Sequence, residues 1–281
     1  MRALPRPVPL ILLILLLVVL APIVTVWAMQ ERFLFPARHN GVPVAASGIW
    51  QVGHVEVPGS GRLAFLFADP EADPGGDPGA PVLLHLHGNG SRAGWSAAST
   101  ENLVAAGIPV VAAEYPGYSG NPGAPTEASL RATAETMAAW ARGRWPGRRL
   151  AVLGESIGSA PAIHLAASGR ADLLVIDSGF TSMTETIRIH LPWLPAVAWL
   201  NRHPMDGIAA LRGAAKALPP TLVMVSAEDP VVPVAMGEAL AAAIPGSTLH
   251  RSGRAGHPVI HGDPRAGAVL LEWLRGHRAP R

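Results

Sequence analysis

The first thirty residues carry a nearly unbroken run of apolar side chains. The run extends from Val8 to Met29 and is interrupted only by two prolines and one threonine. About twenty such residues suffice to cross the hydrocarbon core of a bilayer as a helix. Because the apolar region of a cleavable signal peptide normally has about 7–15 residues, the length favours an uncleaved signal anchor. We therefore expect residues 1–30 to form a single-pass membrane helix and residues 31–281 to form one folded domain.

The charges that flank this run give little indication of its orientation in a membrane. Arg2 and Arg6 precede it, and Arg32 and Arg38 lie after it, so the positive-inside rule favours neither direction. N-terminal anchors with a short basic head usually export the domain that they carry, and we therefore expect an extracytoplasmic domain. Cleavage after Ala28 by a signal peptidase is the alternative.

Beyond a short connector at residues 35–47, apolar runs alternate with helical patterns. The predicted strands are Ile49–Val57, Arg62–Ala68, Val82–Leu86, Ile108–Ala113, Leu150–Leu153, Leu173–Ile176, Thr221–Val225 and a strand-like run at Ser247–Arg251. The predicted helices are Ser91–Ala106, Thr126–Trp145, Ala160–Ala167, Val234–Ile244 and Pro264–Arg275. Continuous apolar strands separated by helices indicate a mostly parallel sheet covered on both faces. The fold class is therefore α/β, with a central sheet flanked by helices.

One stretch interrupts the alternation. Residues 181–218 lie between two predicted strands and contain the apolar elements Leu191–Pro195 and Trp199–Leu200. The stretch is too long for a simple crossover and too apolar for a solvated loop. We expect a small helical cap over one edge of the sheet; ordinary helical packing with buried tryptophans is the alternative.

The strongest chemical signal is Gly154-Glu155-Ser156-Ile157-Gly158, which comes after one predicted strand and opens a helix. A serine on such a tight strand-to-helix turn is held at the carboxyl edge of the sheet, at a helix N-terminus that favours developing negative charge. The turn requires small neighbours, which Gly154 and Gly158 provide. This context favours a nucleophilic serine at Ser156 over a structural Gly-Ser turn.

A second signal, His87-Gly88-Asn89-Gly90, lies directly after the strand Val82–Leu86. Small residues there let backbone N–H groups approach a substrate oxyanion. The expected donors are the N–H of Ile157, the residue after the candidate nucleophile, and the N–H of Asn89. His85 and His87 point to the same face of the strand, which would also suit a metal, but no further ligand lies at the required spacing. We expect no metal site.

An acid and a base should come after the serine in the chain. Asp229 lies just past the strand Thr221–Val225 and is the preferred acid, with Glu228 and Asp177 as competitors and a helix N-cap as its structural alternative. Of the histidines after Asp229, His257 lies in a Gly-rich loop before the last helix, where an imidazole can reach both partners. His261 is the next candidate, ahead of His250 and His277.

Composition excludes several classes of function. The 22 basic and 20 acidic residues give a net charge of only +2, without the basic patch that binding to nucleic acid requires. The absence of cysteine excludes disulfides, thiolate metal sites and a cysteine nucleophile. Hydrophobic residues make up 49% of the chain, ample for a packed core.

Five elements together carry a resemblance to a known superfamily. They are HGNG (87–90), EYPGYSG (114–120), GESIGS (154–159), the Asp229 turn and the Gly256-His257 loop. With these, the sequence resembles the alpha/beta hydrolases over roughly residues 30–276, and within them the small membrane-anchored serine hydrolases of the serine aminopeptidase-like or esterase group. An apolar N-terminal anchor and a cap with a Pro-Trp-Leu-Pro element, here Pro192–Pro195, are typical of that group.

The resemblance implies a Ser156–His257–Asp229 triad that acts through an acyl-enzyme, with the oxyanion held by Ile157 and Asn89. It also implies that Tyr115 and Tyr118 shape a substrate pocket; a packed Gly/Pro-rich loop is the alternative for both tyrosines.

We therefore expect a carboxylic ester or thioester hydrolase that acts on small or lipid-like apolar acyl substrates without a cofactor. Trp193 in the cap is a further candidate for substrate contact, although the cap tryptophans could instead face lipid. A serine peptidase, an acyltransferase and an inactive membrane-anchored binding protein are the alternatives.

Overall fold

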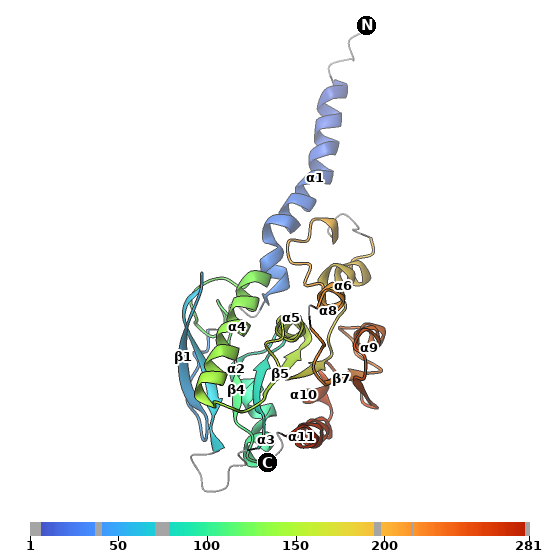
Figure 1. The fold of residues 1–281 in the computed structure, drawn as a ribbon. Coiled ribbons are helices and arrows are strands. Elements are labelled where there is room, and N and C mark those ends of the chain that lie inside the picture. Colours follow the sequence, from blue (N-terminus) through green and yellow to red (C-terminus); the bar gives the residue numbers. More distant parts are fainter. Residues whose placement is uncertain (1–6, 37–40, 71–78, 194–197, 215, 279–281) are drawn as a thin grey trace.

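The fold is built on one eight-stranded sheet (Figure 1). The computed structural model describes residues 7–36, 41–70, 79–193, 198–214 and 216–278. The strands are β1 (Gln51–Val57), β2 (Gly61–Ala68), β3 (Val82–Leu86), β4 (Val110–Ala112), β5 (Leu150–Glu155), β6 (Leu173–Asp177), β7 (Thr221–Ser226) and β8 (Thr248–Ser252). Their spatial order is β1-β2-β4-β3-β5-β6-β7-β8. β1 and β2 pair antiparallel, β2 joins β4 antiparallel, and all the other pairs are parallel.

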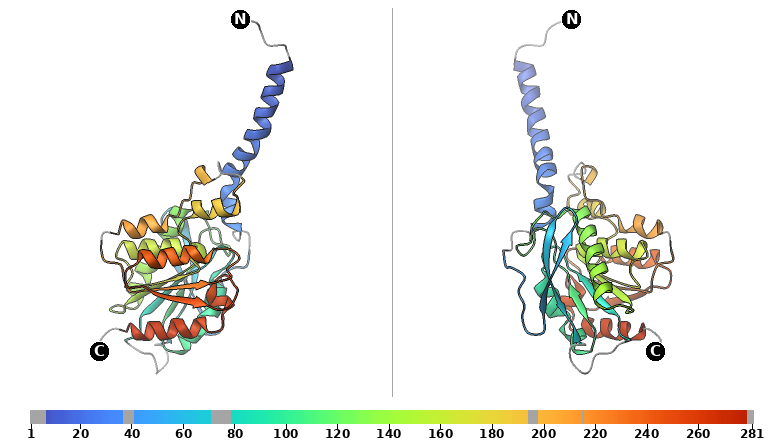
Figure 2. Two further views of the ribbon diagram at one scale, coloured as in Figure 1. Left: turned by 90° about the vertical axis from the view of Figure 1, so that its right-hand side faces the viewer. Right: turned by 60° about the vertical axis from the view of Figure 1, so that its left-hand side comes forward.

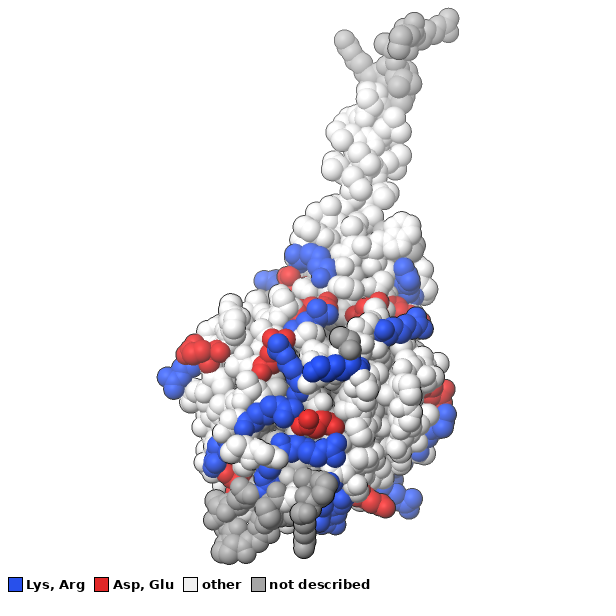
Figure 3. Space-filling view, in the orientation of Figure 1, with Lys and Arg blue, Asp and Glu red and all other residues white. Residues whose placement is uncertain are grey.

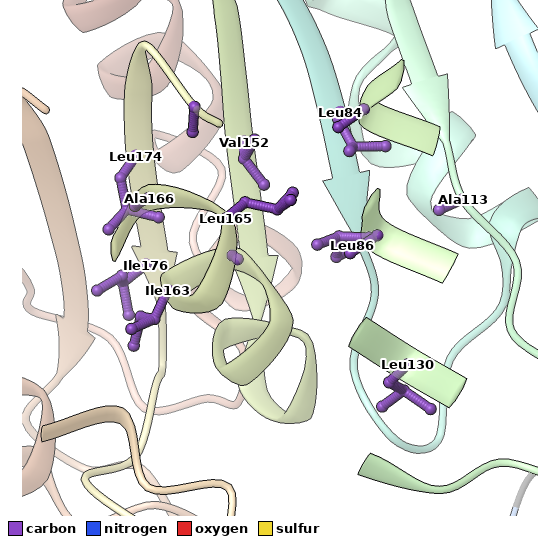
Figure 4. Packing of buried hydrophobic residues seen from close by; sticks show 14 of the residues in the cluster. Leu84, Leu86, Ala113, Leu130, Val152, Ile163, Leu165, Ala166, Leu174 and Ile176 are labelled. Atoms are coloured by element: carbon purple, nitrogen blue, oxygen red, sulfur yellow. The ribbon is translucent and has the colours of Figure 1, made fainter. Parts of the chain in front are cut away.

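Helices cover both faces of this sheet, as the continuous apolar strands indicate. The helices that come after β3 and precede the nucleophile turn are α2 (Ala93–Ser99), α3 (Glu101–Ala105) and α4 (Glu127–Arg144); the later ones are α5 (Ser159–Ala167), α6 (Met183–His190), α8 (Gly207–Arg212), α9 (Val234–Ala243), α10 (Val259–Gly262) and α11 (Ala266–Gly276). One hydrophobic cluster joins a sheet face to α4, α5 and α9, and a second joins the opposite face to α2, α3 and α11. Figure 2 shows this layering, and Figure 4 shows Leu165 of α5 and Leu130 of α4 among the residues packed on the first face. The predicted α/β class is confirmed.

One predicted helix is broken. The residues expected to form a helix at 91–106 form α2 and α3, which meet at Thr100. The Thr100 hydroxyl donates to the carbonyl oxygens of Ser96 and Ala97 at 2.7 and 3.2 Å. This side-chain bonding caps the first helix, and the chain begins a new one.

The N-terminal helix α1 (Pro7–Leu34) projects from the domain (Figures 1 and 2). In the described residues it is the one helix long and apolar enough to cross a membrane, with a mean hydropathy of 3.1. It continues beyond the expected end at residue 30, and its last turn is attached to the domain. Gln30 is buried and bonds the backbone of Leu200 and Arg202, and Phe35, just past the helix, is fully buried in the core.

The segment at 181–218 holds α6 and α8, with residues 194–197 outside the described part. Helix α8 packs on α5 and α9, whereas Trp193 and Trp199 are 73% and 79% exposed. Of the Pro192–Pro195 element, the residues after Trp193 lie outside the described residues. The two tryptophans therefore do not fill a core, which removes the alternative of ordinary packing with buried tryptophans.

Candidate active site

Ser156 occupies a strained turn at the carboxyl end of β5. The chain passes from β5 directly into a short 3-10 helix at Ser156–Gly158 and on into α5. Ser156 has φ of +51°, a left-handed conformation that costs a non-glycine residue roughly 1–2 kcal/mol. Such strain persists only where the surroundings impose it, and it gathers at functional sites.

The two glycines of the turn are required by close contacts. A Cβ on Gly158 would lie 2.1 Å from the carbonyl oxygen of Leu86, and a Cβ on Gly154 would lie 2.6 Å from Cβ of Ala162. Both approaches are shorter than real contacts between these atoms. The helix can therefore lie close to β3 and β5 only with glycine at these positions, which is the reason that the motif has the form Gly-x-Ser-x-Gly.

Three side chains from distant elements meet at this turn. His257 Nε2 lies 2.9 Å from Ser156 Oγ, and His257 Nδ1 lies 2.8 Å from Asp229 Oδ2. The other carboxylate oxygen of Asp229 accepts hydrogen bonds from the N–H groups of Val231 and Val232, each at 2.8 Å. The geometry fixes the tautomer: Nδ1–H donates to Asp229, and Nε2 is left to accept the serine proton.

Electrostatics keep Asp229 ionised. Burial opposes its charge, but the hydrogen bonds from His257 and from two backbone N–H groups outweigh this effect and lower the pKa of Asp229. Its side chain is 2% exposed and that of His257 is 12% exposed. The carboxylate therefore faces the imidazole from a largely water-excluded position, where it can stabilise an imidazolium.

The competing acids and bases have other partners or positions. Glu228 is exposed, and Asp177 accepts the N–H groups of Val259 and Ile260 at the start of α10 at 3.0 and 2.9 Å. His261 bonds Glu155 at 3.1 Å rather than Ser156. The remaining two histidines, His250 on β8 and His277 after α11, are half-buried and lie outside the cavity beside Ser156.

A cavity of about 510 Å³ opens beside Ser156; we call it the Ser156 cavity. Its lining residues are Gly88, Asn89, Gly90, Ser91, Trp95, Glu155, Ser156, Val231, His257, Pro258 and His261. The volume lies within the range of about 300–1,000 Å³ that small-molecule sites have. The exposed Trp95 and Val231 give the rim an apolar character on two sides.

The residues expected to contact substrate do not line this cavity. Tyr115 and Tyr118 are each 1% exposed and lie behind the loop at residues 87–90. The Tyr115 hydroxyl donates to the carbonyl oxygen of His87 at 3.1 Å, and the Tyr118 hydroxyl donates to Oδ1 of Asn89 at 2.9 Å. Their packed-loop alternative describes these positions better, since both rings support the loop from within. Trp193 lines a different cavity, beside α1.

Sequence reasoning assigned no role to Glu114, which organises this loop. The fully buried carboxylate accepts the His87 ring at 2.7 Å, the N–H of Ala93 at 2.9 Å and the Ser119 hydroxyl at 2.7 Å. Burial alone would lower the pKa of His87, but the charge of Glu114 and its hydrogen bond raise it above the ordinary value. The position of Glu114 just past β4, at the start of the EYPGYSG motif, was the available signal.

Glu155, next to the nucleophile, is a second organising carboxylate. It bonds His85 at 3.2 Å and His261 at 3.1 Å, and it accepts the N–H of Gly88 at 3.2 Å. Burial opposes its charge, but the two imidazoles bring the pKa of Glu155 well below the ordinary range, and Glu155 in turn raises the pKa of His261. The cluster links β3 and β5 to α10, the short helix that begins two residues after His257.

His85 on β3 and His87, the first residue after β3, are thus bonded to different carboxylates: His85 to Glu155 and His87 to Glu114. Among the residues that the structure describes, no group of three or more His, Cys, Asp or Glu side chains is arranged to hold a metal ion.

The sheet order, the serine turn and the strand-end positions of Asp229 and His257 define an alpha/beta-hydrolase fold. No family model matches the sequence. The chain is 32% identical over 283 residues to the uncharacterized protein Rv2307c of Mycobacterium tuberculosis, a match that covers 98% of this chain and 94% of that protein. The chain belongs to the same family as this mycobacterial protein.

Some more distant relatives are named for an enzymatic activity. Residues amounting to 57% of this chain are 27% identical to the lysophosphatidylserine lipase ABHD12 of Xenopus tropicalis, and this match spans 46% of that lipase. Among solved structures, an alpha-beta hydrolase of Vibrio vulnificus superposes with a TM-score of 0.68 at 21% identity, over 89% of this chain and 91% of that one. The Pyrococcus furiosus esterase Pf2001 gives 0.65 at 14% identity, over 85% and 96%. These two similarities establish the fold.

Proposed function

We propose that the protein is a serine hydrolase that cleaves the acyl ester of a lipid-like substrate. The observation that carries the proposal is the unbroken chain of hydrogen bonds from Ser156 through His257 to Asp229, at a strained turn that opens into the Ser156 cavity. A merely structural serine needs neither a left-handed backbone nor an imidazole aligned by a carboxylate.

These contacts support a mechanism that passes through an acyl-enzyme. His257 Nε2 takes the proton of the Ser156 hydroxyl as Oγ attacks the ester carbonyl carbon, and Asp229 stabilises the imidazolium that forms. The backbone N–H groups of Ile157 and Asn89 hold the oxyanion of the tetrahedral intermediate. His257 then gives the proton to the leaving alcohol, which departs as the acyl-enzyme forms. A water molecule, deprotonated by the same imidazole, releases the carboxylic acid and restores Ser156.

A lipid-like acyl group is the substrate class that this molecule favours. The rim of the Ser156 cavity presents the apolar side chains of Trp95 and Val231, and a distant relative is named a lysophosphatidylserine lipase. The exposed apolar surface of α1 from Leu10 to Leu20 would place the domain at a bilayer, where such substrates reside. We propose that α1 stays uncleaved as a single-pass anchor and that the domain lies outside the cytoplasm.

Labelling with a serine-reactive fluorophosphonate tests the nucleophile. The full-length protein in phospholipid vesicles is expected to label, and Ser156→Ala and His257→Ala are expected not to. Ser91→Ala is the matched control. Ser91 lines the same cavity, and its buried Oγ forms no hydrogen bond with any residue that the structure describes, so this variant should label like the wild type. Loss of labelling in Ser91→Ala but not in Ser156→Ala would refute the assignment.

Hydrolysis of an ester series identifies the substrate class. We expect turnover of lysophospholipids and monoacylglycerols, and a fall of about 10⁴–10⁶-fold in kcat for Ser156→Ala. A faster rate on aminoacyl amides than on esters of any chain length would contradict the esterase assignment and favour a peptidase. Transfer of the acyl group to an added alcohol in preference to water would favour an acyltransferase.

A further inference from the structure

A second cavity of about 340 Å³ lies between α1 and the cap segment; we call it the anchor cavity. Its lining residues are Ile23, Val26, Trp27, Gln30, Phe33, Leu34, Ile187, Leu191, Trp193, Leu200 and Asn201. None of them lines the Ser156 cavity. One wall is therefore the end of α1, and the opposite wall is α6 with the chain just after it.

The lining of the anchor cavity is almost entirely apolar. The two amide side chains in its lining are already used by the protein. Gln30 donates to the carbonyl oxygen of Leu200 and accepts the N–H of Arg202, and Asn201 is bonded to the backbone of His203 in both directions. Because polar ligand groups need unsatisfied partners in a site, an apolar chain is the ligand that fits.

The cavity lies where the hydrocarbon core of a bilayer would end. About twenty residues cross that core as a helix, and twenty residues counted from Val8 end at Trp27. The Arg202 guanidinium lies 5.0 Å above the Trp27 ring and bonds Glu31 at 2.8 Å. Tryptophan and arginine are typical of this boundary. On the face shown in Figure 3, the described part of the projecting helix is white, without charged side chains, and the first basic side chains lie at its base.

The cap side of the cavity is exposed rather than sealed. Trp193 is 73% exposed and Leu200 39% exposed, and beside them Phe33 of α1 is 62% exposed. A contiguous exposed apolar surface of this kind marks a site of interaction with a membrane or a partner. Since it continues the apolar surface of α1 directly, the bilayer is the neighbour that the structure indicates.

We propose that the anchor cavity binds one acyl chain of a bilayer phospholipid, which enters sideways between α1 and α6. The proposal rests on the proposed function only for the membrane location of α1. Helix α6 connects the anchor cavity to the Ser156 cavity. Ile187 of α6 and Leu191, the first residue after the helix, line the anchor cavity. At the end of the same helix, the His190 ring donates to the carbonyl oxygen of Val231 at 2.7 Å. Val231 lines the Ser156 cavity, so a bound acyl chain lies one helix away from the nucleophile.

Photo-crosslinking tests this site directly. The full-length protein is placed in phosphatidylcholine vesicles that contain a phosphatidylcholine with a diazirine at mid-chain, irradiated, digested and analysed by mass spectrometry. We expect adducts on the peptides that hold Ile187, Leu191 or Leu200 in addition to those on α1. Adducts confined to α1 would overturn the proposal. They are also the result expected if a second copy of the chain, instead of a lipid, covered the cavity.

Two substitutions on or next to α6 distinguish lipid binding in the anchor cavity from simple contact of the cap segment with the bilayer. Leu191→Trp fills the cavity, and it should reduce the cap adducts at least fivefold while those on Leu10–Leu20 stay constant. Ile189→Trp adds an indole to the same helix at a residue that is 45% exposed and does not line the cavity, and it should leave the adducts unchanged. Equal effects of the two variants would refute a defined site.

Leu200→Trp, at another residue of the cavity lining, serves as a second filling variant should Leu191→Trp fail to fold. The same crosslinking in Ser156→Ala separates this proposal from the function proposed above. If Ser156→Ala no longer labels with fluorophosphonate but still forms adducts on the cap segment, lipid binding in the anchor cavity is supported independently of catalysis. If neither the wild type nor Ser156→Ala forms these adducts, the lipid-binding proposal is overturned and the proposed function is unaffected.

Discussion

Replacing Glu114 with glutamine should lower the free energy of unfolding by about 3–5 kcal/mol, the usual effect of breaking a buried ion pair. The two carboxylate oxygens accept four hydrogen bonds, from the His87 ring, the Ser119 hydroxyl and the N–H groups of Ala93 and Tyr115. A glutamine has one side-chain oxygen, and its NH₂ group would face donors. At least one buried donor then loses its partner, and the His87 ring loses its counter-charge.

A matched pair on the surface provides the control. His164 and Glu135 lie 2.8 Å apart, nearly the 2.7 Å of His87 and Glu114, but their side chains are 30% and 37% exposed instead of 0%. Exposed pairs contribute about 0–1 kcal/mol, and this is the loss expected for Glu135→Gln. Two histidine–glutamate pairs with nearly the same distance are thus expected to contribute differently to the free energy of unfolding, because one is buried and the other is exposed.

Thermal unfolding in detergent micelles measures both losses. In a domain of this size about 1 kcal/mol shifts Tm by about 2–4 °C. Glu114→Gln should therefore lower Tm by about 6–20 °C, and Glu135→Gln by at most about 4 °C. If the two variants unfold within about 2 °C of each other, burial does not set the strength of these pairs.

The difference between wild type and Glu114→Gln should also depend on pH. Burial disfavours both charges, but mutual attraction and hydrogen bonding raise the pKa of His87 and lower the pKa of Glu114. The glutamate contribution is complete above about pH 4.5 and is lost at lower pH. The histidine contribution is complete below about pH 6.5 and is lost as pH rises through its raised pKa. We expect the largest difference between about pH 4.5 and 6.5.

Three further predictions concern the site and its surroundings. Asp229→Asn should lower kcat for ester hydrolysis by about 10⁴-fold, because the amide favours the wrong tautomer of the imidazole. Gly158→Ala places a Cβ 2.1 Å from the carbonyl oxygen of Leu86 and should lower the free energy of unfolding by at least about 1–3 kcal/mol. Gly143→Ala, on the exposed face of α4 with nothing within 4 Å, should raise it by about 0.5–1 kcal/mol; thermal unfolding compares the two. Burial, with a neighbouring glutamate, raises the pKa of Asp177 to about 7. Between about pH 4 and 7 the native state therefore holds a proton that the unfolded chain has lost, and the stability due to this group falls across that range. Urea unfolding at pH 5 and pH 8 should show Asp177→Asn gaining stability relative to wild type at the higher pH.

Each of these three has a result that contradicts it. An Asp229→Asn variant with near wild-type kcat would mean that the carboxylate does not orient the imidazole. Equal stability of Gly158→Ala and Gly143→Ala would mean that the turn relaxes around a Cβ. An equal stability difference between wild type and Asp177→Asn at pH 5 and pH 8 would show that the native carboxyl is already ionised throughout this range.

The sheet could be predicted because its strands are buried on both faces. All five residues of β3 and of β6 are buried, so each appears in the sequence as a run that is apolar except for His85 in β3 and Asp177 at the end of β6. The serine turn was also predictable, since its small residues are local requirements of the backbone. The positions of Asp229 and His257 could be inferred from chain order at strand ends, although their distances from Ser156 needed the structure.

Contacts between distant segments were not predictable in this way. Glu155 meets His85 and His261, which lie 70 and 106 residues away in the chain, and nothing local to any of the three indicates the others. The direction of the Tyr115 and Tyr118 rings is set by the loop at residues 87–90 that they pack under. Trp193 was expected at the substrate, but the last turns of α1 provide the cavity that it lines.

The left-handed backbone of Ser156 is a cost that the chain carries at the carboxyl end of β5. A glycine at position 156 would adopt the same φ without steric penalty, whereas a serine there retains about 1–2 kcal/mol of strain. Ser119, Ser178 and Met205 have similar left-handed backbones, so strain by itself does not assign a role to any of the four. Ser156 is the one of these four whose hydroxyl is bonded to an imidazole that a carboxylate aligns. The strain and the hydrogen bond together therefore support the nucleophile proposed above.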